Sequence, residues 1–295
     1  MNHEDLGAEI RRLGSAATTL AAIGAELHLR RHELGDPQIR ATLQDILAHA
    51  LPFPMPDLTD AEAEDLLHTI TVSLASARDI LHDPMRGACW AHYDPMLLKS
   101  QGLISRAFPR HFAQLATERP DIAAAFSHRF LDIGVGVAAL AVEAAEQFPK
   151  LHVTGIDIWE PSLALAREAV AASAHADRVE IKNQDVTTLD EPDSYSAIWF
   201  PILFFPRQVV EAAMPGVVAA LRKDGLLIIP RPAPPPPGLP ALLGRLRMLR
   251  NGGASWTDDE LVALVSANGL VDVAFCPGPA LAAMPGGRML LARKP

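Results

Sequence analysis

The sequence is poor in cysteine, in aromatic residues and in long apolar runs. Of its 295 residues only Cys89 and Cys276 are cysteines, and Phe, Trp and Tyr together make up 5%. Two cysteines are too few for a disulfide scaffold, a zinc ribbon or a cluster held by thiolates. The longest apolar run, residues 197–205, is interrupted by Pro201 and falls far short of the roughly 18 residues of a membrane span. We therefore expect no membrane partner.

Positive charge is scarce as well. The chain has 26 Lys and Arg against 35 Asp and Glu, which gives a formal net charge of −9. Because nucleic acids are polyanions, an acidic chain is poorly suited to them, and we expect no nucleic-acid partner. The first residues, Met-Asn-His-Glu-Asp, lack the basic and apolar regions of a secretory signal. These features predict a cytoplasmic protein.

Hydrophobic periodicity divides the chain near residue 128. In residues 1–127, Leu20, Ile23 and Leu27 recur at near-helical spacing, and Thr59 with Glu62 has the pattern of a capping box. This pattern predicts an all-α N-terminal domain. Residues 128–295 instead alternate short β-prone runs with helical ones, which predicts a parallel sheet covered by helices on both faces. The expected strands are 129–133, 151–156, 179–182, 197–200 and 226–230, and the expected helices are 137–148, 161–173 and 207–221.

The last part of the chain has a different pattern. Thr257 with Glu260 predicts another helix start, and two β-prone runs follow at 271–276 and 288–293. The loop between these runs has no room for a crossover helix, so they predict an antiparallel hairpin. Residues 230–240 contain seven prolines and are expected to be stiff. This segment is either a spacer before the next helix or a rigid rim over an active site.

The strongest local motif is a β-prone run that leads into a glycine turn and then a helix. Gly134 and Gly136 supply the turn and let a ligand approach the backbone closely. With Ala139 they also satisfy the dinucleotide-binding pattern G-x-G-x-x-A.

Three acidic residues lie at the ends of three successive predicted strands, on the edge where open α/β sheets bind ligands. Asp132 ends an apolar strand, where a carboxylate is costly unless a group such as an ammonium bonds it. Asp157, 23 residues after Gly134, is placed to accept from ribose hydroxyls. Asp185 is placed to accept from an adenine amino group. Few common cofactors combine a cationic tail, a ribose and an adenine.

Residues 128–295 resemble the class I S-adenosylmethionine-dependent methyltransferases of the small-molecule type, which carry an N-terminal helical domain. The resemblance rests on residues 131–136, on Asp157, on the pair Asp185 and Val186, and on the turn at 222–226. The third motif glycine is Ala138 here. The resemblance implies an α/β, Rossmann-like, seven-stranded sheet with an antiparallel final strand, and S-adenosyl-L-methionine as cofactor, with S-adenosyl-L-homocysteine as product. It implies that the cofactor is bound by Tyr93, Gln101, Asp132, Gly134, Gly136, Asp157, Ile158, Asp185, Val186 and Phe200.

The acceptor site is expected just after the fourth strand. Methyltransferases that act on adenine or glutamine often carry Asn/Asp-Pro-Pro-Tyr/Phe there, and this chain does not, which disfavours those acceptors. It offers Trp199 and Phe204 instead, which either line a pocket for a small apolar or aromatic acceptor or belong to the core. Methyl transfer to oxygen usually needs a base, and His92 and His111, which flank the segment before the glycine loop, are the candidates. Displacement at a sulfonium carbon needs no metal, and we expect none.

Two other functions stay open at this point. An NAD(P)-dependent oxidoreductase is favoured by the G-x-G-x-x-A pattern and the acid that follows it, but it gives Asp132 and Asp185 no obvious role. A protein that binds S-adenosylmethionine without methylating, as a regulator or a cyclase, is favoured by the lack of an evident base. The sequence names neither the acceptor nor the atom that receives the methyl group. By analogy with the resembling enzymes, the N-terminal helices are expected to form a homodimer.

Overall fold

The computed structural model describes residues 3–31, 36–90, 94–281 and 286–295. The chain forms two compact units, residues 1–84 and residues 85–295. The predicted boundary at 127/128 was wrong, because the helices of residues 95–125 belong with the sheet. Phe108, Phe112 and Ile122 of these helices lie in one core cluster with Phe130 of the first strand. Apolar packing, which local periodicity does not reveal, sets this boundary.

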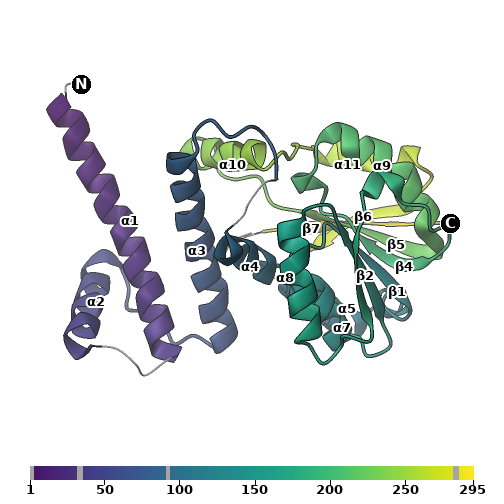
Figure 1. Ribbon diagram of the computed structural model, residues 1–295, viewed down its shortest axis with the longest axis horizontal. Helices are drawn as coiled ribbons and strands as arrows, with labels where there is room; N and C mark the ends of the chain where they lie inside the picture. The colour runs from purple at the N-terminus through teal and green to yellow at the C-terminus, as the bar shows by residue number, and fades with distance from the viewer. Residues whose placement is uncertain (1–2, 32–35, 91–93, 282–285) are drawn as a thin grey trace. The chain divides into compact units, whose positions relative to one another are not determined.

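The described residues of the first unit form helices α1 (His3–Arg31), α2 (Pro37–Ala50) and α3 (Asp60–His82), labelled in Figure 1. Asp36 caps the second helix by accepting from the amides of Gln38 and Ile39, and Pro37 occupies its first position. The third begins at the predicted capping box, since Thr59 and Glu62 bond reciprocally. Leu27 and Ile70 are central to the small core of this unit.

The second unit begins with three short helices, which precede the sheet and pack on it. They are α4 (Pro95–Ile104), α5 (Ala107–Ala116) and α6 (Pro120–Ala125). The sheet has seven strands in the order β3-β2-β1-β4-β5-β7-β6. Its strands are β1 (Arg129–Ile133), β2 (His152–Asp157), β3 (Val179–Asn183), β4 (Tyr195–Trp199), β5 (Leu221–Arg231), β6 (Val271–Pro277) and β7 (Arg288–Arg293).

The directions of the strands agree with the prediction. Strands β1 to β5 pair in parallel, and β7 is antiparallel to both of its neighbours, β5 and β6. The Rossmann-like α/β fold with a reversed final strand is thereby confirmed. Gly269, at the end of the last helix, has a φ of +84°, as expected for a residue that ends a helix.

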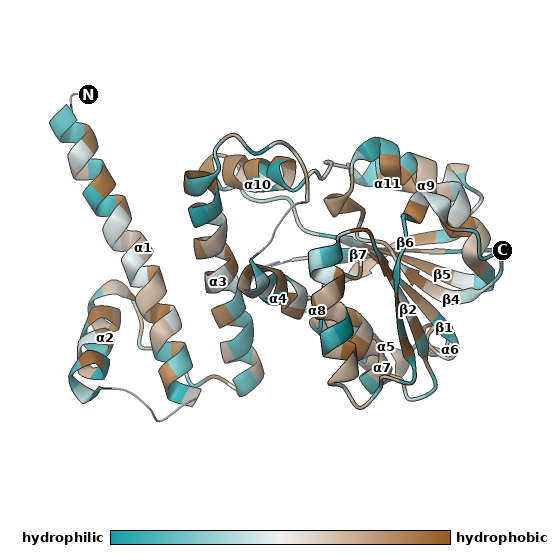
Figure 2. Ribbon diagram, viewed as in Figure 1, coloured by the Kyte–Doolittle hydropathy of each residue, from teal (hydrophilic) through white to brown (hydrophobic). Residues whose placement is uncertain are grey.

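Both faces of the sheet are covered, because successive strand residues point to opposite sides. Phe130 packs with α5, α6, α7 and α8, whereas Leu131 and Ile133 pack with α9 and α11. Hydrophobic residues are accordingly concentrated at the centre of the sheet in Figure 2. The helices are α7 (Ala139–Gln147), α8 (Glu160–Ala171), α9 (Arg207–Ala220), α10 (Leu239–Arg250) and α11 (Asp258–Ala267), with short 3-10 turns η1 (Val186–Thr188) and η2 (Ile202–Phe204).

The proline-rich segment joins β5 to α10, a helix that the sequence did not predict. In this structure residues 232–236 carry no helix or strand, which agrees with a spacer. Five leucines of α10 are exposed: Leu239, Leu242, Leu243, Leu246 and Leu249. Among the described residues, no helix is both long and apolar enough to cross a membrane.

Candidate functional site

The glycine loop joins β1 to α7 at the carboxyl edge of the sheet. The amides of Gly134 and Val135 both donate to the carbonyl of Ile156 in β2, at 2.8 and 3.0 Å. Gly134 and Gly136 have φ values of +70° and +56°, which favour glycine. A Cβ built on Gly136 would have the Gly134 carbonyl oxygen, 3.9 Å away, as its nearest neighbour. The loop therefore leaves open space beside Gly136.

A second glycine, in the neighbouring strand, lets the loop pack closely against the sheet. A Cβ at Gly155 would lie 2.5 Å from Cγ2 of Val135, so only glycine leaves room for that side chain. Ala138, which stands where the family has its third glycine, has a φ of +61° and is fully buried. An alanine in this left-handed region carries a cost of about 1–2 kcal/mol, which the surrounding packing has to offset.

Asp132 is a buried acid with one unsatisfied oxygen. It is 2% exposed, and its Oδ2 atom has no hydrogen-bond partner among the described residues. In the sheet it lies opposite Gly155 of β2 and Trp199 of β4. Burial, and then the charge of nearby Asp157, raise the pKa of this carboxyl well above its usual range. An acid in this state is suited to binding a cationic group, which would satisfy Oδ2 and favour its ionised form.

Asp157 ends β2, and backbone amides occupy both of its carboxylate oxygens. Oδ2 accepts from the amide of Gly136 at 2.9 Å, and Oδ1 accepts from Ile158 at 2.7 Å and Trp159 at 2.9 Å. Burial raises the pKa of Asp157, although these backbone bonds act in the opposite direction. A carboxylate has about four acceptor sites, so one remains for a ligand. Asp157 thus ties the glycine loop to β2, a role that the sequence did not reveal.

The predicted adenine contacts follow β2 and β3. Asp185 is exposed, and its Oδ1 accepts from both the amide and the hydroxyl of Thr187 at 2.8 Å. Val186 is buried in the core, so its side chain is not available to a ligand there. The side chain of Ile158 is 65% exposed and offers an apolar surface next to Asp157.

Helix α4 packs against the glycine loop. A Cβ on Gly102 would be 2.3 Å from Cγ2 of Val137, a loop residue, so the two elements touch directly. The preceding residue, Gln101, has a buried Oε1 atom with no hydrogen-bond partner in the part of the chain that the structure describes. Like Asp132 it is a buried acceptor that lacks a donor. Two other predicted residues of this segment, His92 and Tyr93, lie outside the described residues.

The aromatic residues after β4 divide between core and surface. Trp199 is 4% exposed, and its ring packs 4.7 Å from that of Phe108. Its environment is that of a core residue, so the predicted pocket-lining role does not fit its position. Phe200 is fully buried and meets Phe205 edge-to-face. Phe204 is 42% exposed and so is available to an acceptor.

Trp90 was not predicted to belong to the site. Its ring meets that of Phe204 edge-to-face at 5.5 Å, and the amide of the preceding Cys89 donates to the carbonyl of Arg250. A Cβ on Gly253 would lie 2.0 Å from the carbonyl oxygen of Leu203, so the turn after α10 closely approaches the segment after β4. Its signal in the sequence was its position two residues before His92, one of the predicted site residues.

His111 is hydrogen-bonded at the last strand of the sheet. Its Nε2 lies 3.0 Å from the carbonyl oxygen of Pro277, at the end of β6. Strand β6 is four strands away from β1 in the sheet, which corresponds to roughly 19 Å at about 4.8 Å per strand. The role of His111 as a base stays a prediction.

Comparison with known proteins shows what this part of the chain resembles. Residues 130–225 match a protein-family model described as "Methyltransferase domain". This stretch contains the glycine loop and the strand ends that carry Asp157 and Asp185. Of the curated proteins, a tRNA1(Val) (adenine(37)-N6)-methyltransferase from Bacteroides thetaiotaomicron is 34% identical over 73 residues, 24% of this chain and 31% of that protein. The match thus spans about a third of this relative's length.

Solved structures extend the likeness of the methyltransferase domain to the whole fold. A putative O-methyltransferase from Nostoc punctiforme is 14% identical with a TM-score of 0.64, and each chain is covered completely. Human N-acetylserotonin methyltransferase, solved with its cofactor SAM, is 13% identical with a TM-score of 0.64, covering 100% of this chain and 99% of the other. At these identities the likeness shows a shared fold.

Proposed function

We propose that this protein transfers a methyl group from S-adenosylmethionine to a small, apolar or aromatic acceptor. The observation that carries the proposal is the pair of buried acceptors without donors, Oδ2 of Asp132 and Oε1 of Gln101. Both belong to elements that contact or lead into the glycine loop. A buried polar atom without a partner is costly, and a cationic ammonium donates several hydrogen bonds. An oxidoreductase that binds a dinucleotide supplies no such cation at this position.

The remaining residues fit the other parts of the same cofactor. The open space beside Gly136 accommodates the methionine tail, and the free acceptor capacity of Asp157 suits a ribose hydroxyl. Oδ2 of Asp185, which receives no bond from the described residues, suits the adenine amino group. Ile158 would cover one face of the adenine. Tyr93 and His92 stay predictions for the methionine end and for a base.

The apolar segment after β4 suggests how the chain assists the reaction. When bound, S-adenosylmethionine supplies a methyl group on a positively charged sulfur. Between Trp199 and Phe205 no side chain can take up a proton, and Phe200 and Ile202 are buried. This wall excludes water and holds a flat acceptor against Phe204, so that positioning and desolvation do much of the work. The acceptor atom then brings its own free electron pair, or passes a proton to a group such as His92.

Calorimetry with three ligands tests the cofactor assignment. We expect S-adenosylmethionine and S-adenosylhomocysteine to bind and NAD not to bind. Tight binding of NAD without binding of S-adenosylhomocysteine would refute the proposal. Turnover of S-adenosylmethionine with a panel of phenols, aromatic amines and tRNA then distinguishes the acceptor classes. Methylation of tRNA alone would overturn the small-molecule assignment, whereas binding without any turnover would favour a regulator or a cyclase.

We also propose that the first unit forms a homodimer. Leu6, Ile10 and Leu13 are spaced along one side of α1, and each is at least half exposed. Burying this apolar stripe against a second copy would remove it from water. Light scattering should give twice the mass of the 31.7 kDa chain, and Ile10→Glu should give the monomer. A monomeric wild type would refute this part of the proposal.

A further inference from the structure

We propose that Gly102 and Val137 form a size-matched contact that sets how closely α4 approaches the glycine loop, and that Glu143 holds α4 in this position through Arg106 and Arg110. In this arrangement Gln101 faces the cationic end of the bound cofactor. The inference rests on the proposed function. It makes Gly102, Val137 and Glu143 positioning residues, which act through Gln101 and the loop.

The contact between α4 and the loop leaves no room for a side chain on Gly102. An added Cβ would lie 2.3 Å from Cγ2 of Val137 and 3.7 Å from Cβ of Ala139. Glycine inside a helix is unfavourable relative to alanine, so its presence here is explained by the close approach that it permits. Val137 is itself buried, and it directly precedes the strained Ala138. A shift of α4 would therefore act directly on the loop.

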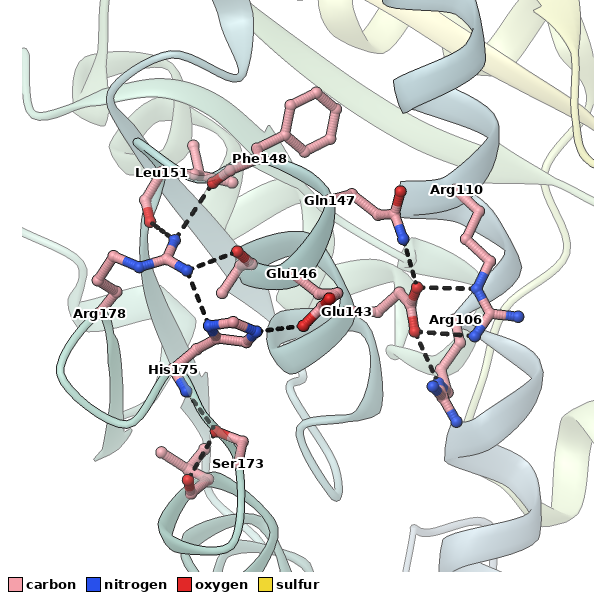
Figure 3. Close-up of polar contacts among 12 residues, drawn as sticks. Arg106, Arg110, Glu143, Glu146, Gln147, Phe148, Leu151, Ser173, His175 and Arg178 are labelled. Carbon is pink, nitrogen blue, oxygen red and sulfur yellow. Dashed lines mark hydrogen bonds and ion pairs between the residues drawn. The ribbon is translucent and has the colours of Figure 1, made fainter.

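Ion pairs around one buried glutamate fix the chain just after α4 (Figure 3). Glu143 of α7 is 4% exposed and accepts from Nε of Arg106 at 2.8 Å. Arg110 bonds both of its oxygens, at 2.8 and 3.0 Å, and Gln147 adds a bond at 2.9 Å. Burial raises the pKa of Glu143, but the bonds from Arg110, Arg106 and Gln147 outweigh it and lower the pKa overall. Such a buried acid is ionised and fully bonded, which makes its geometry specific.

The two contacts have the same consequence for Gln101. Arg106 follows the last residue of α4 by two positions, and Gly102 lies within that helix, next to Gln101. Helix α7, which carries Glu143, begins directly after the glycine loop. The loop therefore contacts α4 at Val137, and α7 holds the start of α5, directly after α4, at Glu143. This double attachment explains how Oε1 of Gln101 stays buried without an internal donor.

The first experiment disturbs the contact and then restores it, with S-adenosylhomocysteine as the probe in calorimetry of the full chain. Gly102→Ala should weaken binding at least tenfold, because the added methyl group forces α4 away from Val137. The double variant Gly102→Ala/Val137→Ala should bind within about threefold of Val137→Ala alone. Gly14→Ala is the control, because a Cβ there meets nothing within 4 Å. Equal affinity of Gly102→Ala and wild type would overturn the inference.

The second experiment tests the link to Gln101. Gln101→Ala should weaken binding in the wild-type background and have almost no further effect in the Gly102→Ala background, because Gln101 is already displaced. The same loss in both backgrounds would overturn the inference. If wild type itself does not bind S-adenosylhomocysteine, it is the proposed function that fails, and this result is distinct from the others.

The third experiment tests Glu143 without changing the contact at Gly102. Glu143→Gln should weaken binding of S-adenosylhomocysteine and increase hydrogen exchange of the α4 amides. Glu146→Gln is the control, because Glu146 also lies on α7 but is paired with His175 and not with Arg106 or Arg110. Faster exchange in α4 with unchanged affinity would show that Glu143 only stabilises the fold, and would overturn its positioning role. This experiment also decides the matter if Gly102→Ala does not fold.

Discussion

Replacing Asp157 should affect stability and cofactor binding together. In Asp157→Ala the amides of Gly136, Ile158 and Trp159 lose their acceptor. Bonds to a charged group contribute about 1.5–3 kcal/mol each, and water compensates in part, because Ile158 is largely exposed. We expect a net loss of about 2–3 kcal/mol in the free energy of unfolding. For a domain of roughly 200 residues this lowers the melting temperature by about 4–12 °C.

In the same variant, the loss of binding free energy should be larger than the loss of folding free energy alone would suggest. Without the ribose acceptor and with a loosened loop, S-adenosylhomocysteine should bind roughly 30- to 1000-fold more weakly, corresponding to about 2–4 kcal/mol. Thermal melts without ligand and calorimetry with S-adenosylhomocysteine measure the two effects separately. Glu168→Ala, which removes one exposed charge from α8, is the matched control. An unchanged melting temperature refutes the role of the backbone bonds, and unchanged affinity refutes the ribose assignment.

Further variants separate binding from packing. The raised pKa of Asp132 means that the folded protein keeps a proton that the unfolded chain releases near pH 4, about its ordinary pKa. The stability of the unliganded protein should therefore fall as pH rises above that value. Asp132→Asn should remove this fall in melts from pH 4 to 8, yet weaken binding of S-adenosylmethionine. Gly136→Ala should cost about 1–2 kcal/mol of stability in thermal melts but block cofactor binding. Gly155→Ala, whose added Cβ would lie 2.5 Å from Val135, should prevent stable folding, as expression and thermal melts would show. Trp199→Ala should lose about 3–5 kcal/mol in denaturant unfolding, and Phe204→Ala less than about 1 kcal/mol; equal losses would contradict the division into core and surface.

The sheet could be predicted because its strands are short apolar runs bounded by turns. β1 and β7 have the predicted bounds, and the others differ by one residue or a few at their ends. Helix α10 was missed although its leucines recur at helical spacing, because it follows a run of prolines that favours a stiff extended segment. Its apolar face is exposed and does not pack in a core. The unit boundary was missed because α4, α5 and α6 have helical patterns like those of the first unit. Only packing against the sheet assigns them.

The candidate site could be predicted as a set of strand ends but not as a set of contacts. The positions of Asp132, Asp157 and Asp185 follow from the parallel topology. The bond from Gly136 to Asp157 spans 21 residues and depends on the turn geometry, which the motif does not specify. The burial of Trp199 depends on Phe108 of α5, and the distance of His111 from β1 depends on strand order. Each of these facts is set by long-range packing.

The position of β7 between β5 and β6 has a consequence for the order in which the chain folds. β6 precedes β7 in the sequence but pairs with the sheet only through it. During synthesis β6 leaves the ribosome with no partner, and β5 keeps an open edge until β7 arrives and pairs with both. Unpaired strand edges attract other chains, so the interval before β7 is inserted is when this protein is most exposed to aggregation.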